Sequence, residues 1–223
     1  MSKVAVVLSG CGYLDGSEIH EAVSVLVHLS RHGAAVSCFA PDIRVGAVDH
    51  VTGKPMDQQR SVLVESARIA RGKIGRLSEL RASNFDAVVF PGGFGAAKNL
   101  CNFAEAGAAC VVNPEVERVV KEFHASGKPV GMCCIAPVIG ARVLGKRAGG
   151  PGVRVTVGSE GGASHAVEEM GASHVVKPVT QSLGDEVQGV YTSPAYMYGE
   201  AKPHEVFEGI GAMIDQVMSR AGR

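Results

Sequence analysis

Residues 130–137 read Val-Gly-Met-Cys-Cys-Ile-Ala-Pro, and this stretch determines the fold class of the chain. The short apolar run over residues 129–133 predicts a buried strand. A helix is predicted over residues 135–144, with Pro137 in its first turn, where the missing N–H is tolerated. A strand that passes almost directly into a helix needs a sharp turn, and hydrolase folds use such a turn to present a nucleophile. The sequence therefore predicts a strand–nucleophile–helix turn at this cysteine pair.

Other strand and helix patterns alternate on both sides of this stretch. Further strands are predicted at Lys3–Ser9, Ala35–Ala40, Ala87–Phe90, 153–157, 174–179 and 189–193. Further helices are predicted at 18–31, 61–71, 114–124, 165–170 and 205–219. Residues 43–60 show no clear periodicity and are interpreted as an insertion. Because strands alternate with helices, we expect an α/β fold whose parallel sheet is covered on both faces, in one domain spanning residues 1–223.

Charge and composition exclude several classes of function. Among 223 residues, 22 basic side chains balance 22 acidic ones, so the formal net charge is zero. A general nucleic-acid or anionic-membrane binder would need a basic surplus, and we expect neither partner. No apolar stretch approaches the ~20 residues of a membrane span, and we expect no targeting segment in this chain. The six cysteines show no disulfide or zinc spacing, which predicts reduced thiols and no metal site.

The cysteine pair at the sharp turn is the first candidate for chemistry. A thiol at a helix N-terminus experiences a partial positive charge that favours the thiolate, so we expect a lowered pKa. Strand alternation would send Cys133 and Cys134 to opposite sides, so that one of them at most is reactive. The alternative is that both are small core residues, because free cysteine is commonly buried.

Two other loops follow predicted strands and would lie at the same edge of the sheet. Gly92 and Gly93 lie in Pro-Gly-Gly-Phe-Gly, where backbone N–H groups can approach a ligand and form an oxyanion hole; the alternative is a tight turn. Glu18 and Glu21 share one face of the first helix, and either carboxyl group could exchange a proton with a thiol. The alternative is that the helix dipole alone favours them there. No phosphate-binding glycine fingerprint is present, so nucleotide binding is unsupported.

Together these motifs resemble a known family. The segments Leu8–Gly12, Asp15–Ala22, Phe90–Leu100, Cys134–Pro137 and Thr192–Met197 are similar to the ElbB-type glyoxalase branch of the ThiJ/PfpI superfamily. That superfamily is related to class I glutamine amidotransferases and to the parkinsonism-associated deglycase. The resemblance covers residues 3–218 and implies a flavodoxin-like, three-layer sandwich.

The resemblance also implies roles for individual residues. Cys134 would be the nucleophile and Glu21 its acidic partner, with Glu18 as second choice. The backbone N–H groups of Gly93 and Ile135 would form the oxyanion hole. Gly92 and Cys133, with Glu18, would support the site. No cofactor or metal is implied, a homodimer is expected, and relatives of this kind are cytoplasmic or lie in the mitochondrial matrix.

One departure from the superfamily pattern limits the expected activity. Members with robust activity carry a histidine after the strand that here spans 153–157, whereas this chain continues Gly158-Ser159-Glu160. Without that imidazole, proton transfer loses about 10²–10⁴-fold. The leading hypothesis is a weak glyoxalase that converts glyoxal, a small aldehyde, to glycolate and acts weakly as a deglycase. The alternatives are a non-catalytic thiol redox sensor or mitochondrial protein and, less favoured, an amidotransferase-like domain.

Overall fold

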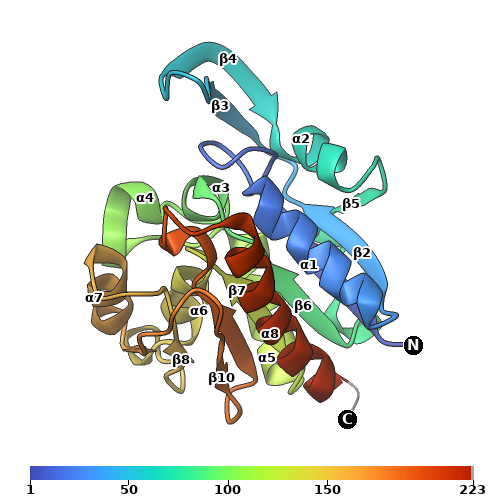
Figure 1. Ribbon diagram of the computed structural model, residues 1–223, viewed down its shortest axis with the longest axis vertical. Coiled ribbons are helices and arrows are strands. Elements are labelled where there is room, and N and C mark those ends of the chain that lie inside the picture. The colour runs from blue at the N-terminus through green and yellow to red at the C-terminus, as the bar shows by residue number, and fades with distance from the viewer. Residues whose placement is uncertain (222–223) are drawn as a thin grey trace.

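A seven-stranded sheet forms the centre of the computed structural model, which describes residues 1–221 (Figure 1). The strand order is β10-β11-β7-β6-β1-β2-β5. The strands are β1 (Lys3–Val7), β2 (Ala35–Ala40), β5 (Ile74–Arg76), β6 (Ala87–Phe90), β7 (Val130–Cys133), β10 (Leu183–Asp185) and β11 (Val190–Ser193). Every neighbouring pair is parallel except β10 and β11. The predicted flavodoxin-like α/β fold is confirmed, with one antiparallel edge strand, because the short β10–β11 connection leaves no room for a crossover.

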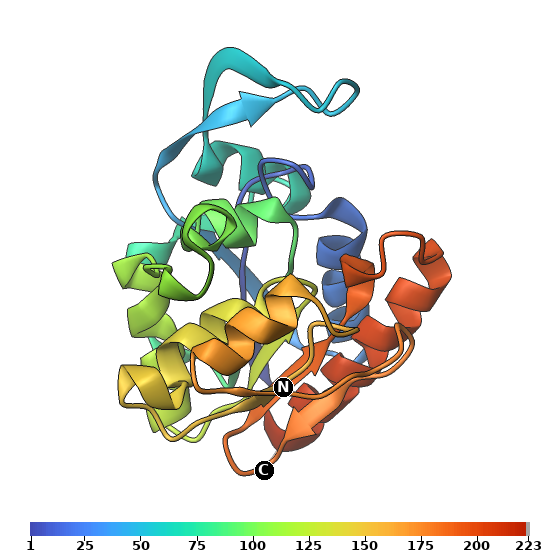
Figure 2. The same ribbon diagram turned by 90° about the vertical axis from the view of Figure 1, so that its left-hand side faces the viewer.

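Helices cover both faces of this sheet, as the sequence predicts (Figure 2). One face carries α1 (Ile19–Arg31) and α8 (Pro203–Ala221), and the other carries α5 (Pro114–Ala125) and α6 (Pro137–Leu144). Successive side chains of β1 point to opposite faces of the sheet and so enter different cores. Val4 and Val6 belong to the core under α1 and α8, whereas Ala5 and Val7 belong to the core under α5 and α6. The three-layer sandwich thus follows from strands that are apolar on both sides.

Some predicted elements are displaced or shortened. The predicted strands at 153–157 and 174–179 contract to β8 (Arg154–Val155) and β9 (Ser173–His174), which pair with each other outside the main sheet. The helices α2 (Val62–Ile69) and α7 (Gly162–Glu169) lie close to their predicted positions. The short helices α3 (Phe94–Lys98) and α4 (Phe103–Ala106) were not expected, because one turn of helix gives no periodic signal.

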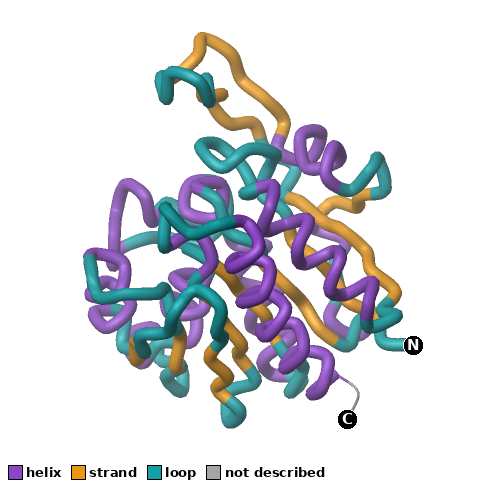
Figure 3. Tube along the Cα trace, viewed as in Figure 1, coloured by secondary structure: helices purple, strands orange, loops and turns teal. Residues whose placement is uncertain are grey.

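The insertion at residues 43–60 is a β-hairpin of β3 (Arg44–Val48) and β4 (Pro55–Ser61). It projects from one end of the molecule, away from the central sheet, as the two orange strands at the top of Figure 3. Residues 51–59 are all exposed. Because neither face of this segment is buried, its sequence lacks the alternation that normally identifies a strand.

The loops after β1, β6 and β7 meet at one edge of the sheet, because the three strands are parallel neighbours. Phe94 N–H donates to the carbonyl of Tyr13 at 2.7 Å, and Gly95 N–H donates to that of Gly16 at 2.9 Å. The side-chain amide of Asn99, directly after α3, donates to the carbonyls of Ser9 and Asp15 and so binds the loop after β1 to the segment after β6. Within residues 1–221, no helix combines the length and apolarity of a membrane span.

Candidate active site

Cys134 occupies the sharp turn between β7 and α6. Its φ of +59° lies in the left-handed region, which non-glycine residues rarely adopt and which costs of order 1–3 kcal/mol. The turn is fixed on both sides: Cys134 N–H donates to the Ser193 carbonyl at 2.9 Å, and Ala136 N–H donates to the Cys133 carbonyl at 3.0 Å. The predicted strand–nucleophile–helix turn is therefore present, although the helix begins at Pro137 rather than at residue 135.

Glu21 and Glu18, which the sequence could not fully distinguish, have different roles in the structure. Glu18 is the N-cap of α1, and its Oε2 accepts the Glu21 N–H at 2.7 Å. Glu21 lies one turn further along and points inward, fully buried. Its carboxyl group lies beside the Cys134 side chain, because a Cβ atom at Gly92 would overlap Cys134 Cβ and lie 2.6 Å from Glu21 Oε2. Glu21 is thus the carboxyl group beside the thiol, as the resemblance implies, and Glu18 serves the cap.

Four groups surround the Glu21 carboxyl group. Gly92 N–H donates to Oε2 at 3.0 Å and Tyr196 N–H donates to Oε1 at 3.2 Å. The Cys133 thiol lies 3.9 Å from Oε2, and the Cys134 thiol completes the set. A carboxyl group held by two backbone donors and two thiols has a fixed orientation, which a proton-transfer group requires.

The two thiols lie on the same side of the chain, so the predicted opposite placement is wrong. Both Cys133 and Cys134 belong to the core cluster beneath α1 and α8, and both reach Glu21. Alternation applies only while the backbone stays extended. The left-handed φ at Cys134 ends that geometry and turns its side chain back toward the carboxyl group.

Two backbone N–H groups, those of Gly93 and Ile135, favour the thiolate form of Cys134. These are the two donors predicted for the oxyanion hole. Gly93 has a φ of +92°, which only glycine adopts without strain. At Gly92, a Cβ atom would lie 2.6 Å from Glu21 Oε2 and would overlap the Cys134 side chain. The glycine pair therefore allows the loop after β6 to approach the thiol closely.

Protonation at this centre differs from the sequence prediction. Burial, reinforced by the charge of Glu18, raises the pKa of Glu21 to about 7. Burial and the charge of Glu21 also raise the pKa of the Cys134 thiol, although the Gly93 and Ile135 N–H groups favour its thiolate. The expected lowering of the thiol pKa is wrong, because burial disfavours the thiolate and the charge of the nearby Glu21 carboxylate opposes a second negative charge. Because each group influences the pKa of the other, we expect their ionisation to be linked.

The thiol opens into a pocket of about 340 Å³. Its lining is mostly apolar and consists of Tyr13, Glu18, Gly93, Phe94, Cys134, Ile135, Tyr196 and Met197. Cys134 as a whole residue retains 8% of its surface exposed, so it is recessed at the wall of this pocket. Within the described residues, this lining includes no histidine, in keeping with the departure noted in the sequence. Such a volume suits a small ligand.

Sequence reasoning assigned no role to four pocket residues: Tyr13, Phe94, Tyr196 and Met197. Tyr196 and Met197 end a motif that carried the family resemblance, and that motif was the available signal. The Tyr196 hydroxyl hydrogen-bonds His20 Nδ1 at 2.9 Å, although His20 faces away from Glu21 on the helix. For metal binding, the described part of the chain contains no group of three or more His, Cys, Asp or Glu side chains that could hold an ion.

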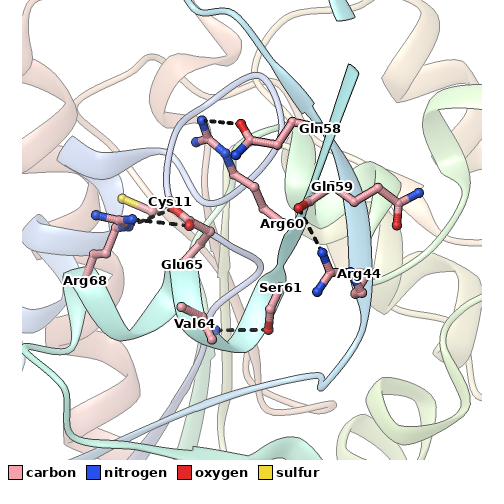
Figure 4. Close-up of a pocket in the computed structure, with 9 residues that line it drawn as sticks. All are labelled: Cys11, Arg44, Gln58, Gln59, Arg60, Ser61, Val64, Glu65 and Arg68. Atoms are coloured by element: carbon pink, nitrogen blue, oxygen red, sulfur yellow. Dashed lines mark hydrogen bonds and ion pairs between the residues drawn. The ribbon is translucent and has the colours of Figure 1, made fainter. Parts of the chain in front are cut away.

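A larger pocket of about 670 Å³ lies under the projecting hairpin (Figure 4). It is polar and is lined by side chains from the hairpin, from α2 and from the first loop: Cys11, Arg44, Gln58, Gln59, Arg60, Ser61, Val64, Glu65 and Arg68. Arg68 is paired with Glu65 at 2.8 Å. Cys11 is the one cysteine in this pocket; burial is the main reason why its pKa is raised. None of the site residues predicted from the sequence lies here.

The fold and the site together define a class of protein. A flavodoxin-like sheet carries a cysteine in a left-handed turn at the end of a central strand, with a buried glutamate from the first helix beside it. This is the arrangement that the ThiJ/PfpI resemblance predicts.

The chain belongs to the DJ-1/PfpI family, whose sequence profile matches residues 3–183. It is 52% identical to the mitochondrial ES1 protein homolog of Rattus norvegicus, over 100% of this chain and 85% of that protein. It is also 52% identical to the mitochondrial glutamine amidotransferase-like class 1 domain-containing protein 3 of Homo sapiens, over 100% of this chain and 84% of that protein. The narrower ElbB-type assignment stays a prediction.

A solved structure agrees with this assignment. An isoprenoid biosynthesis protein with an amidotransferase-like domain from Ehrlichia chaffeensis superposes with a TM-score of 0.91 at 37% identity, over 99% of both chains. The Drosophila melanogaster DJ-1beta structure, at 19% identity and a TM-score of 0.51, shares the fold.

Proposed function

We propose that this protein is a cofactor-independent glyoxalase that converts glyoxal to glycolate at Cys134. The observation that carries the proposal is that the Glu21 carboxyl group and the glycine loop after β6 meet at the Cys134 side chain, where the N–H groups of Gly93 and Ile135 favour the thiolate. These are the proton-transfer group and the oxyanion donors that addition to a carbonyl group requires. The pocket in front of the sulfur has room for a small dialdehyde.

The reaction starts with the addition of sulfur to one aldehyde carbon. As the carbon–sulfur bond forms, the thiol proton passes to the Glu21 carboxylate, and the oxyanion lies against the Gly93 and Ile135 N–H groups. Glu21 returns this proton to the oxyanion, which gives a hemithioacetal. The thiol therefore ionises only while it attacks, which is consistent with its raised pKa.

A proton then moves between the two carbons. Glu21 removes the C–H proton of the hemithioacetal carbon, and the electron pair forms an enediol with the second carbon. Glu21 returns the proton to the second carbon, while the second oxygen gains a proton and the first hydroxyl loses one. One carbon is thereby oxidised to a thioester carbonyl and the other is reduced to a hydroxymethyl group. Water hydrolyses the thioester, releasing glycolate and the thiol.

The same addition to early glycation adducts would appear as weak deglycase activity. We expect slow turnover in both reactions, because no imidazole among the described lining residues assists proton transfer. General acid–base catalysis by such a group contributes about 10²–10⁴-fold.

Glycolate formation from glyoxal by the purified protein, followed by NMR, tests the proposal. Cys134→Ser should abolish the reaction, while Cys11→Ser, which changes a thiol in the other pocket, should leave it intact. Cys133→Ser should reduce it less than tenfold, because serine can keep a polar contact with Glu21. Equal rates for wild type and Cys134→Ser would refute the proposal.

The second candidate is a non-catalytic thiol redox sensor or structural protein of mitochondria. The lack of a histidine among the described pocket residues favours it, whereas the raised pKa of Cys134 opposes it, since redox sensors depend on thiolate character. Peroxide titration with mass spectrometry would reveal selective oxidation of Cys134. An amidotransferase-like activity is the third candidate, and ammonia release from glutamine would support it.

Compartment and assembly complete the proposal. The names of two 52% identical relatives describe them as mitochondrial, and we propose the mitochondrial matrix for this protein, with the cytoplasm as the alternative. We propose a homodimer that acts on a small aldehyde without nucleic-acid or membrane partners. Analytical ultracentrifugation tests the dimer.

A further inference from the structure

Tyr196 connects the buried carboxyl group with the open pocket. It lies in the short 3₁₀ turn η5 (Ala195–Met197) that follows β11. Its backbone N–H donates to Glu21 Oε1 at 3.2 Å, and Tyr196 lines the same pocket as Cys134. Tyr196 and the thiol therefore face one small pocket, which a molecule attached to the sulfur would enter.

The phenol continues outward to His20 on α1. Tyr196 Oη and His20 Nδ1 are 2.9 Å apart, and the ring centroids are 5.9 Å apart. His20 Nδ1 also lies 4.0 Å from Glu18 Oε1. Because 59% of the His20 side chain is exposed, the imidazole contacts solvent. Phenol and imidazole thus form a continuous polar path from the apolar pocket to water.

We propose that Tyr196 and His20 form a proton relay for the reaction at Cys134, with Tyr196 as a catalytic residue and His20 as the group that recharges it. This inference rests on the proposed glyoxalase function and names the source of one proton in it. Tyr196 donates its O–H proton to the oxygen on the second carbon. The phenolate takes the Nδ1 proton of His20, and the imidazole regains a proton from water at Nε2.

The hydrogen-bond pattern fits this direction of transfer. When His20 carries its proton on Nδ1, it donates to Tyr196 Oη and leaves the phenol O–H free to point into the pocket. Burial, with the charges of Glu18 and Glu21, raises the pKa of the Tyr196 phenol, so it stays protonated until it meets a developing alkoxide.

The relay would replace part of what the missing loop histidine supplies elsewhere in the superfamily. In the part of the chain that the structure describes, no histidine lines the pocket, but His20 is hydrogen-bonded to Tyr196, which does line it. A relay through a second group is slower than direct transfer, which agrees with the weak activity expected here.

Three variants test the relay against a purely structural role. Tyr196→Phe keeps the ring and the N–H bond to Glu21 and removes only the hydroxyl group. It should lower kcat for glyoxal about tenfold or more and change KM less than twofold. His20→Ala should lower kcat as well, and free imidazole in the buffer should restore it, because the vacated position is open to solvent. Imidazole should not restore the double variant.

Rescue by imidazole is the deciding readout, because a merely structural hydrogen bond would not respond to it. Unchanged alkylation of Cys134 by iodoacetamide would show that all variants keep the site intact. A kcat within twofold of wild type for Tyr196→Phe, or His20→Ala without rescue, would overturn the relay and leave the proposed function standing. A wild-type protein that does not convert glyoxal would overturn both.

Discussion

The backbone N–H of Gly92 donates to Oε2 of Glu21 over 3.0 Å. This bond joins the loop after β6 to the first turn of α1, 71 residues apart in the chain. It holds the carboxyl group beside the Cys134 side chain, where the neighbouring Gly93 N–H favours the thiolate. The candidate active site is therefore assembled from three loops around one buried carboxyl group.

The pH dependence of turnover should report the protonation of that carboxyl group. The mechanism needs Glu21 as a carboxylate to receive the thiol proton, and the pKa of Glu21 is raised to about 7. We expect kcat/KM for glyoxal to rise with pH through an apparent pKa near 7, a value that belongs to the Glu21–Cys134 pair. A stopped assay between pH 5 and pH 9 in buffers of constant ionic strength measures it, and a flat profile would contradict this role for Glu21.

Glu18→Gln should move that midpoint to lower pH. The negative charge of Glu18 is the second cause of the raised pKa of Glu21, after burial. Glutamine keeps an oxygen that can accept the Glu21 N–H and so retains the helix cap. The same pH profile, recorded on this variant, should keep its shape and shift toward acid. A midpoint that stays in place or rises would show that Glu18 does not act on the pair.

Folding stability should also depend on Glu21. Because the pKa of Glu21 is raised on folding, its protonated form favours the native state at low pH, and this contribution is lost as pH rises through 7. Glu21→Gln removes the titration. The free energy of unfolding of wild type, minus that of the variant, should fall by roughly 2–4 kcal/mol between pH 4.5 and pH 8. Urea unfolding at several pH values measures it, and a constant difference would argue against the assignment.

Gly92→Ala should disrupt the site because the new methyl group has no room. Its Cβ would overlap the Cys134 side chain and lie 2.6 Å from Glu21 Oε2. Overpacking of this kind costs about 1–3 kcal/mol, and we expect a loss of most glyoxal turnover with it. Gly46→Ala is the matched control, because a Cβ at this hairpin position meets no atom within 4 Å. Thermal unfolding and the glyoxal assay, run on both variants, should separate them clearly.

Local sequence was sufficient for much of the fold and for part of the site. The strands Ala35–Ala40 and Ala87–Phe90 match their predicted bounds, because buried parallel strands read as continuous apolar runs. The sharp turn and the glycine pair are local features of the sequence, whereas the choice of Cys134, Gly93 and Ile135 came from the family resemblance. The hairpin at 44–61 could not be predicted, since β4 is almost wholly exposed and polar and β3 buries only Ala47.

The remaining parts of the site depend on contacts across the fold. Glu18 and Glu21 lie on one helix face. Which of the two carboxyl groups reaches the thiol depends on how α1 packs against the sheet. Tyr196 is 175 residues from Glu21 and contacts it because β11 pairs with β7. The direction of the thiol pKa shift was also inaccessible, because it depends on burial and on the distance to a carboxyl group rather than on the helix end alone.

The rate of Cys134 alkylation by iodoacetamide, measured against pH in wild type and in Glu21→Gln, tests the central claim most directly. Peptide mass spectrometry separates Cys134 from the other five cysteines. The account predicts that the wild-type rate rises through an apparent pKa near 7, as Glu21 becomes able to take the thiol proton, and that Glu21→Gln lacks this step. Identical pH profiles in the two proteins would contradict the pairing of this thiol with this carboxyl group.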